Sequence, residues 1–295
     1  MSIKHIVLSA GSYKGLYMLG ALKHLNDIQY YSINNIENIY AVSVGAIFAV
    51  LLAMRLDLND IIEYVINRPW EKLFNIEGDH LINCMYNKGL LNISVFNSIF
   101  ENFFKKEKID KLITMQQFYE KYKINIQMLS LNINTFECEV LSHKNTPNLC
   151  IIEAVYMSCS LPFIFEPNKY NGDYYIDGGL INPYPLKMCI EENKDTDTIM
   201  SIFIVDDNVK SKVVDTDNIL TYGFFLFNTF IKKNRISYKV PEFKNEILIP
   251  ADELNVIDAN RMINNLDARK KAIEQGMKYA KLFNEYKKKT TIPSQ

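Results

Sequence analysis

The chain has 295 residues, which is enough for one large domain or two modest ones. Hydrophobic residues make up 48% of it and charged residues 23%, as in an ordinary soluble globular protein. The net charge of −1 produces no overall field that would attract nucleic acid, so a nucleic-acid-binding protein is not expected.

The first part of the chain alternates predicted strands and helices. A short buried strand and a small-residue turn over residues 4–11 lead into a helix over 15–27, whose leucines recur at helical spacing. A second strand at 36–42 precedes a helix at 46–56 that is apolar all round, and a further helix ends before Pro69. This order predicts an α/β fold with a largely parallel sheet.

Residues 70–121 differ in character, because aromatic residues alternate with lysines and no strand stands out. We expect a helical insertion there. The following segments predict two strands joined by a turn, a short helix, a hairpin with an Asn-Gly turn and another buried strand, at 123–134, 137–143, 149–160, 170–179 and 197–206. An aromatic-rich helix at 218–233 and a helical segment at about 252–289 follow, without a repeat or a firm domain boundary.

The cysteines and the apolar runs bear on compartment. Five cysteines without a C-x-x-C pair do not predict a zinc site, and free thiols in a reducing compartment are the simplest interpretation. The N-terminal apolar run is too short for a signal peptide, and the longest near-apolar run, residues 41–54, is too short to span a bilayer. We therefore expect an intracellular, cytoplasmic protein without a signal peptide, transmembrane helix or metal.

Ser43 lies where a predicted strand meets a predicted helix, in the sequence Ala-Val-Ser-Val-Gly that ends at Gly45. This is a variant of G-x-S-x-G, which places a nucleophilic serine on a tight strand–turn–helix elbow. The dipole of the following helix would favour negative charge developing at the serine. Short motifs also match by chance, so a buried serine bonded to a carbonyl is the simpler interpretation of the pentapeptide alone.

A second candidate is the segment LSAGSYKG, residues 8–15, which also joins a strand to a helix. Successive N–H groups at a helix start form an anion site, either for a phosphate or for the oxyanion of an acyl-transfer intermediate. The glycine spacings of dinucleotide- and nucleotide-binding loops are absent, which disfavours a nucleotide-binding module. Lys14 either holds the turn by contacting carbonyls, contacts a substrate phosphate, or is solvated.

The supply of histidine disfavours a serine–acid–histidine triad. Such a triad needs a histidine late in an α/β-hydrolase chain, and the histidines are His5, His24, His80 and His143. Asp177 ends an alternating strand and is followed by two glycines, which taken alone fits a turn aspartate that accepts backbone N–H bonds.

Taken together and in order, four segments resemble the patatin-like phospholipase family. They are LSAGSYKG, VSVGA, SCSLPFIF at 158–165 and DGGLINPYP at 177–185. The resemblance covers residues 6–190, and the stretch RKKAIEQGMKYA is also similar. It implies one patatin-like domain over 1–295, with three layers and a central, mostly parallel sheet flanked by helices. It further implies a helical insertion or cap at about 70–121 and a C-terminal helical segment at about 252–289.

The resemblance also implies the chemistry. Ser43 and Asp177 would form a catalytic dyad without histidine, and the amides of Gly11, Ser12 and Tyr13 would hold the oxyanion. Because the reference pKa of aspartate is about 3.9, we expect Asp177 to orient the hydroxyl and take its proton only as the transition state develops. No metal or other cofactor is implied, so the reaction is expected to be independent of calcium. The positions that would support these motifs are Ala10, Lys14, Gly15, Gly45, Gly178 and Gly179; Ala10, Ser12 and Ala41 stand where the family usually has glycine.

The implied substrate is a phospholipid or lysophospholipid, cleaved through an acyl-enzyme with transient contact to a membrane surface. The alternatives are a neutral-lipid or carboxylester hydrolase, an acyltransferase, or a non-catalytic lipid-binding protein. Apolar residues at 95–104 and 219–231 would line an acyl channel, contact a bilayer or pack in the core, among them Phe224, Phe225, Phe227 and Phe230. Lysine clusters at 105–108 and 287–289 either attract anionic lipid or are solvated.

Overall fold

The computed structural model describes residues 2–74, 86–206, 222–223, 225–226, 229, 243–251 and 256–291. The strands are β1 (His5–Leu8), β2 (Asn38–Val42), β3 (Gly89–Leu91), β4 (Asn125–Asn132), β5 (Glu137–Leu141), β6 (Phe163–Phe165), β7 (Asn168–Tyr170), β8 (Asp173–Asp177), β9 (Ile199–Asp206) and β10 (Glu246–Ala251). The α-helices are α1 (Gly15–Asp27), α2 (Val44–Ala53), α3 (Leu58–Asn67), α4 (Trp70–Leu73), α6 (Ser94–Lys106), α7 (Met115–Tyr122), α8 (Ile151–Cys159), α9 (Leu186–Glu192), α11 (Val256–Asn264) and α12 (Leu266–Thr291).

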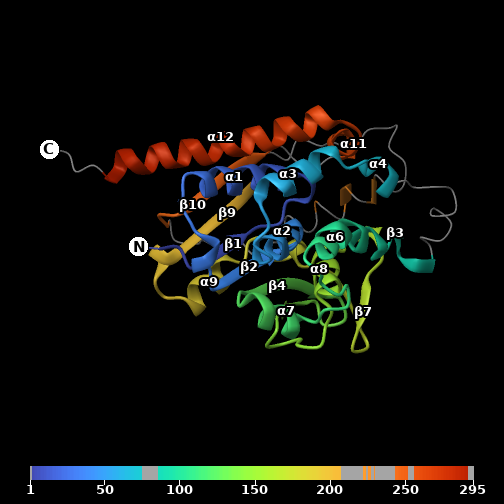
Figure 1. Cartoon of the computed structure of the whole chain (residues 1–295). Helices are drawn as coiled ribbons and strands as arrows, with labels where there is room; N and C mark the ends of the chain where they lie inside the picture. Colours follow the sequence, from blue (N-terminus) through green and yellow to red (C-terminus); the bar gives the residue numbers. More distant parts are fainter. Residues whose placement is uncertain are drawn as a thin grey trace.

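One sheet of eight strands organises the described part of the chain. Its order is β10-β9-β1-β2-β4-β8-β7, with β5 paired to β4. The strands from β10 to β4 run parallel, β5 and β8 each pair antiparallel with β4, and β7 pairs antiparallel with β8. The predicted fold, with a central and mostly parallel sheet between helices, is confirmed (Figure 1).

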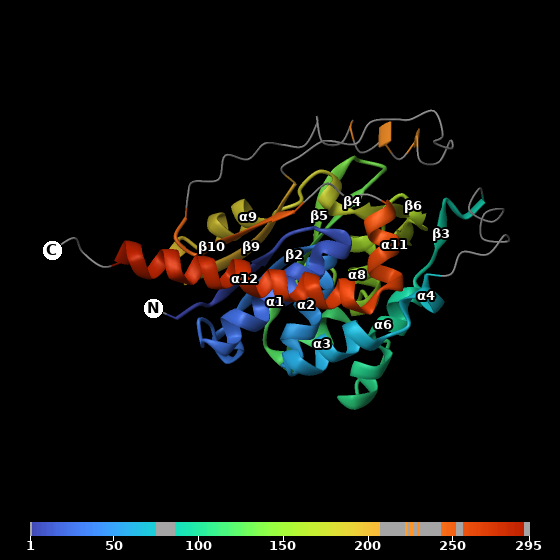
Figure 2. The same cartoon turned by 90° about the horizontal axis from the view of Figure 1, so that it is seen from above.

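The two faces of the sheet are covered by different helices. In β1, Ile6 and Leu8 belong to the large core cluster that includes residues of α1, α2, α8 and α12, whereas Val7 packs with Leu186 and Cys189 of α9 on the opposite face. This alternation follows from the two-residue period of a strand. Figure 2 shows α9 and α3 on opposite sides of the sheet, so the helices and the sheet form three layers.

Helix α12 lies along α1 in Figures 1 and 2, and a glycine on each helix allows their backbones to touch. A Cβ atom at Gly20 would lie 2.0 Å from the carbonyl oxygen of Ile273. A Cβ atom at Gly276 would lie 1.9 Å from the carbonyl oxygen of Tyr17. Since a methyl group does not fit in that space, the crossing requires glycine at both positions.

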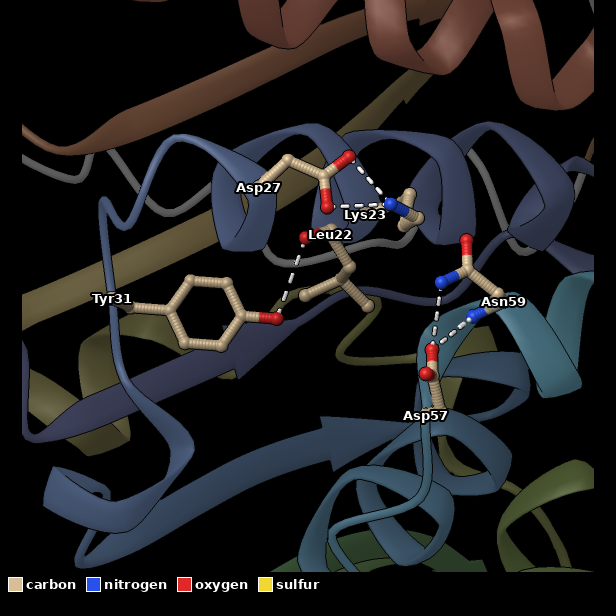
Figure 3. Close-up of polar contacts among 6 residues, drawn as sticks. All are labelled: Leu22, Lys23, Asp27, Tyr31, Asp57 and Asn59. Atoms are coloured by element: carbon tan, nitrogen blue, oxygen red, sulfur yellow. Dashed lines mark hydrogen bonds and ion pairs between the residues drawn. The ribbon is translucent and has the colours of Figure 1, made fainter.

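Figure 3 shows local side-chain contacts near the end of α1 and at the start of α3. Asp57 caps α3, because its carboxylate accepts hydrogen bonds from the backbone N–H of Asn59 at 2.8 Å and from its side-chain amide at 2.9 Å. Lys23 and Asp27 form an ion pair one turn apart near the end of α1. The Asp57 cap therefore marks the start of α3, and the ion pair stabilises the last turns of α1.

Two predicted hairpins are confirmed. Strands β4 and β5 pair antiparallel around the Asn-Thr-Phe turn, and β7 pairs antiparallel with β8. In the second hairpin Asn171 and Gly172 adopt φ angles of 51° and 97°, as the predicted Asn-Gly turn requires. The helix predicted before Pro69 is also present as α3.

One prediction needs correction. The region 70–121 contains a strand, β3, which pairs in parallel with β6 in a separate two-stranded sheet. The described part of the helical segment predicted at about 252–289 consists of two helices, because Asn265 ends α11 and then caps α12 by accepting a hydrogen bond from the amide of Ala268 at 3.0 Å. The aromatic helix predicted at 218–233 mostly lies outside the described residues, as do Phe224, Phe227 and Phe230. The division of the chain into a cap and a C-terminal segment stays a prediction.

Two further findings concern the described ranges as a whole. None of their helices combines the length and hydrophobicity needed to cross a bilayer. The four cysteines that the structure describes are free; Cys159 and Cys189 are buried, and Cys138 and Cys150 are half-buried.

Candidate active site

Ser43 occupies a strained turn between β2 and α2. Its φ and ψ angles are 56° and −131°, a combination that non-glycine residues rarely adopt. The turn brings the start of α2 against β1 so closely that a Cβ atom at Gly45 would lie 2.6 Å from the carbonyl oxygen of Leu8. Ala41 is fully buried within β2, so an alanine is accommodated where the usual motif has its first glycine. The chain thus forms the strand–turn–helix elbow expected at Ser43.

The structure brings Ser43 and Asp177 together across 134 residues of sequence. The Ser43 hydroxyl donates a hydrogen bond to Oδ2 of Asp177 at 2.6 Å, while Oδ1 accepts the backbone N–H of Gly179 at 2.7 Å. Both side chains are buried, with 5% of Ser43 and 2% of Asp177 exposed. Each carboxylate oxygen therefore has a fixed partner, which orients the group toward the hydroxyl.

The end of α8 and the residue after it support this pair. The backbone N–H of Ser43 donates to Oγ of Ser158 at 3.0 Å, and the Ser158 hydroxyl donates to the carbonyl oxygen of Leu129 at 2.7 Å. The backbone N–H of Asp177 donates to the carbonyl oxygen of Ser160 at 3.0 Å. The supporting roles of these two serines of SCSLPFIF were not predicted from the sequence. The signal available was two serines separated by one residue just before Leu-Pro.

The loop after β1 forms a short 3₁₀ turn, η1 (Ser12–Lys14), that leads into α1. The amide of Lys14 donates to the carbonyl oxygen of Gly11 at 3.0 Å, and that of Gly15 donates to the carbonyls of Ser12 and Tyr13. Gly11, Ser12 and Tyr13 come just before these two residues in the chain. Their amides therefore take the place of the first N–H groups of a helix. Ser12 has a φ of 50°, so this serine adopts the backbone conformation for which glycine is usual.

The neighbouring motif positions are tightly packed. Lys14 is only 2% exposed, so the interpretation of it as a solvated lysine is wrong. A Cβ atom at Gly179 would lie 2.7 Å from that of Ala10, and the glycine therefore makes room for the alanine. Gly15 and Gly178 likewise lie against Val44 and the backbone of Leu129.

An apolar cavity of about 300 Å³ adjoins Ser43, and Ser12 and Tyr13 line it as well. Its walls come from α2, α3, α4, α6 and α11, from the first residues of α1, from Arg269 of α12, and from the end of α8 with the segment after it. The part of 95–104 that faces it comprises Val95, Phe96, Ile99 and Phe103, and α11 contributes Ala259, Met262 and Ile263. Histidine does not line this cavity among the described residues, and His80 lies outside them. The arrangement offers a hydroxyl nucleophile beside a space for a hydrocarbon chain.

Cys159 is a second nucleophilic side chain in the cavity wall. Burial raises the pKa of its thiol well above the ordinary value, and the nearby Asp177 carboxylate raises this pKa further. The thiol therefore stays protonated at neutral pH, and a protonated thiol is a poor nucleophile.

Arg269 holds the α11 wall in place. Its buried guanidinium donates hydrogen bonds to the carbonyl oxygen of Ile66 at the end of α3, at 2.7 and 3.0 Å. It also donates to the carbonyl oxygens of Met262 at 2.8 Å and Ile263 at 2.9 Å. A cation at the negative ends of two helices is favourable, so this residue joins α3 to α11. This role was not predicted from the sequence, in which Arg269 begins the stretch RKKAIEQGMKYA.

The two lysine clusters differ. Lys105 pairs with Glu101 at 2.7 Å and Lys106 with Asp60 at 2.5 Å, all four with exposed side chains. Lys287 is instead packed over the ring of Tyr30, 4.7 Å from its centroid. Within the described ranges, no group of three or more His, Cys, Asp or Glu side chains is arranged to hold a metal ion.

Comparisons with known proteins show what this chain is similar to. A family model described as Patatin-like phospholipase matches residues 6–190. A relative named probable lipid hydrolase 463L, from Invertebrate iridescent virus 6, is 28% identical over 71% of this chain and 73% of its own length. The uncharacterized protein R571 of Acanthamoeba polyphaga mimivirus is 30% identical over 95% of this chain and 93% of its own. The crystal structure of VipD from Legionella pneumophila superposes with a TM-score of 0.57 at 17% identity, covering 97% of this chain and 67% of that one.

Proposed function

Because this chain belongs to the patatin-like phospholipase family, we propose that it is a serine acyl hydrolase that cleaves phospholipids or lysophospholipids through a Ser43–Asp177 dyad. The observation that carries the proposal is the 2.6 Å hydrogen bond from the Ser43 hydroxyl to Asp177, next to an apolar cavity. The name of the iridescent virus relative, a probable lipid hydrolase, supports the reaction class.

In the first step Ser43 Oγ attacks the ester carbonyl carbon, and its proton passes to Oδ2 of Asp177. The carbonyl oxygen becomes an oxyanion, which the amides of Gly11, Ser12 and Tyr13 bind. One such donor typically contributes about 2.7–4 kcal/mol to transition-state stabilisation. The C–O bond to the leaving alcohol then breaks, and the protonated Asp177 returns the proton to that alcohol.

The second step releases the acyl group. Water attacks the acyl-enzyme at the same carbonyl carbon, and Asp177 accepts the proton of the water as the new C–O bond forms. The bond to Ser43 then breaks, and Ser43 regains the proton while the fatty acid leaves. An alcohol in place of water would give acyl transfer instead. The dyad requires only side chains and amides of this chain, so we propose that calcium is not needed.

The cavity supports a long acyl chain as the group that is bound. The residues that line it are almost all apolar, and burying a methylene group contributes about 0.8 kcal/mol. Such a substrate is held in a membrane or micelle, and we propose transient contact with that surface. Phe163, with 49% of its surface exposed, lies beside Ile164 and Phe165 of the cavity wall and is suited to this contact. The free described cysteines support action in a reducing compartment, the cytoplasm.

The test is a panel of phospholipid, lysophospholipid, triacylglycerol and simple carboxylester substrates, run with and without EDTA. We expect turnover of the first two, unchanged by EDTA, and labelling of Ser43 by a fluorophosphonate. Ser43→Ala and Asp177→Asn should each lower kcat by at least about a hundredfold, in line with loss of a nucleophile or a base. Asp173→Asn, the same change on the same strand, is the matched control and should retain turnover.

Several outcomes would change the conclusion. Wild-type turnover in either dyad variant removes that residue from the mechanism. A preference for triacylglycerol or simple esters favours the neutral-lipid or carboxylester alternative. Binding of lipid vesicles without hydrolysis or fluorophosphonate labelling favours a lipid-binding protein.

A further inference from the structure

Two cavities lie back to back between α3 and α6. The first is the apolar cavity at Ser43, and the second is a groove of about 820 Å³ whose charged lining residues are Asp60, Glu63, Arg68, Lys72, Glu101 and Lys106. Tyr64 and Phe103 line both, whereas Ser43 lines only the first. These two aromatic side chains therefore separate the apolar space from the polar one.

This aromatic partition, Tyr64 and Phe103, is held firmly. The two rings meet edge to face with centroids 4.7 Å apart. The Tyr64 hydroxyl donates to the carbonyl oxygen of Ile99 at 2.9 Å, and the guanidinium of Arg68 donates to the same hydroxyl and lies over the ring, 5.0 Å from its centroid. Phe103 is 6% exposed. Moving these side chains aside would break several of these contacts and is therefore costly in free energy.

We propose that the aromatic partition is an acyl-chain stop, which sets the longest chain that the cavity at Ser43 accepts. This inference rests on the proposed function, because it takes the occupant of the cavity to be the acyl chain of the substrate. A chain long enough to reach the partition buries all its methylene groups against apolar walls. A longer chain must bend, or leave methylene groups outside the cavity, because the space beyond the partition is closed to it and lined by charges.

The direct test measures kcat/KM for a homologous series of saturated acyl esters of increasing chain length. With the wild-type chain we expect a rise of roughly fourfold per methylene group, followed by a cut-off beyond which kcat/KM no longer rises. Phe103→Ala and Tyr64→Leu open the partition and should move the cut-off to longer chains. Phe103→Leu is a milder version, which keeps the test possible if the alanine variant does not fold.

Phe104→Ala is the matched control. Phe104 is the next residue on α6 and is 3% exposed, but it lines neither cavity. Its cut-off should equal that of the wild type. An unchanged cut-off in folded Phe103 and Tyr64 variants, or an equal shift in the Phe104 variant, would overturn the proposal.

A second measurement separates this proposal from the catalytic one. Fatty acids of increasing length are added to Ser43→Ala protein, and the rise in Tm is recorded for each. We expect the rise to reach its maximum at the same length as the wild-type cut-off, and at a longer length when Phe103→Leu is added. Absence of turnover in the wild-type chain, together with a maximum that moves to longer fatty acids when Phe103→Leu is added, would refute the hydrolase but support the stop. Turnover with no dependence of either readout on the partition would refute the stop alone.

Discussion

Replacement of Ser158 by alanine tests whether the support of the elbow matters for catalysis. The Ser158 side chain is fully buried and is joined to two backbone groups, the amide of Ser43 and the carbonyl of Leu129. Ser158→Ala leaves both groups buried without this partner. An unsatisfied buried group costs about 1–3 kcal/mol, so the free energy of unfolding should fall by about 2–4 kcal/mol.

Most molecules of the variant should remain folded, since the free energy of unfolding of a protein is about 5–15 kcal/mol in total. For a chain of 295 residues, whose entropy of unfolding is about 0.6 kcal/mol/K, the loss corresponds to a decrease in Tm of roughly 3–6 °C, measured by differential scanning fluorimetry. The second consequence is kinetic. The Ser43 amide helps to hold a strained backbone, and a displaced nucleophile should lower kcat by roughly 10- to 100-fold with little change in KM.

Ser142→Ala is the control for this substitution. The Ser142 hydroxyl oxygen is buried and accepts two backbone amides, those of Lys144 at 3.3 Å and Asn145 at 3.2 Å, but it lies at the end of β5, away from the elbow. The Ser142→Ala variant should have a lower Tm and an unchanged kcat. Wild-type kcat in the Ser158→Ala variant, or an equal loss of kcat in the Ser142→Ala variant, would refute a role of Ser158 in holding the elbow.

Two other predictions concern stability and shape. Arg269→Ala should lower the free energy of unfolding by about 2–4 kcal/mol, because the α11 wall loses its bonds to α3. It should also reduce the turnover of long-chain esters more than that of short ones. Lys271→Ala, on the exposed side of α12, should have neither effect. Burial lowers the pKa of His5 below its ordinary value of about 6.5. As the pH decreases, the unfolded chain therefore binds a proton at His5 before the folded chain does. The free energy of unfolding should fall as the pH decreases through 6.5 toward the folded-state pKa. Urea unfolding across that pH range should show this decrease, His5→Gln should reduce it, and an identical pH slope in both proteins would assign it to other groups.

The order of elements was predictable from the sequence because its signals are local. Alternating apolar runs, an Asn-Gly turn and the proline after α3 each depend on a few neighbouring residues, and each is found as expected. The strand β3 was not predictable in this way. It has three residues and forms only because it pairs with β6. The pairing requires glycine at position 89, because a Cβ atom there would lie 2.3 Å from the amide nitrogen of Glu166.

The candidate site divides in the same manner. The motif order led to Ser43 and Asp177, which the fold brings within hydrogen-bond distance. The supporting role of Ser158 was not predictable, because it depends on the end of α8 reaching the elbow. The pocket wall in α11 was equally hidden, since apolar residues such as Met262 look like ordinary core positions until the cavity is seen.

The glycine contact between α1 and α12 ties the length of one segment to the shape of the cavity. Gly276 fixes α12 against α1, and the residues from Arg269 to Gly276 connect that contact to the wall of the apolar cavity. Each residue turns an α-helix by about 100°, so deletion of a single residue in this interval would rotate the pocket-facing side of the preceding segment away from its place. Exposed positions there are free to change in identity, whereas the number of residues is not.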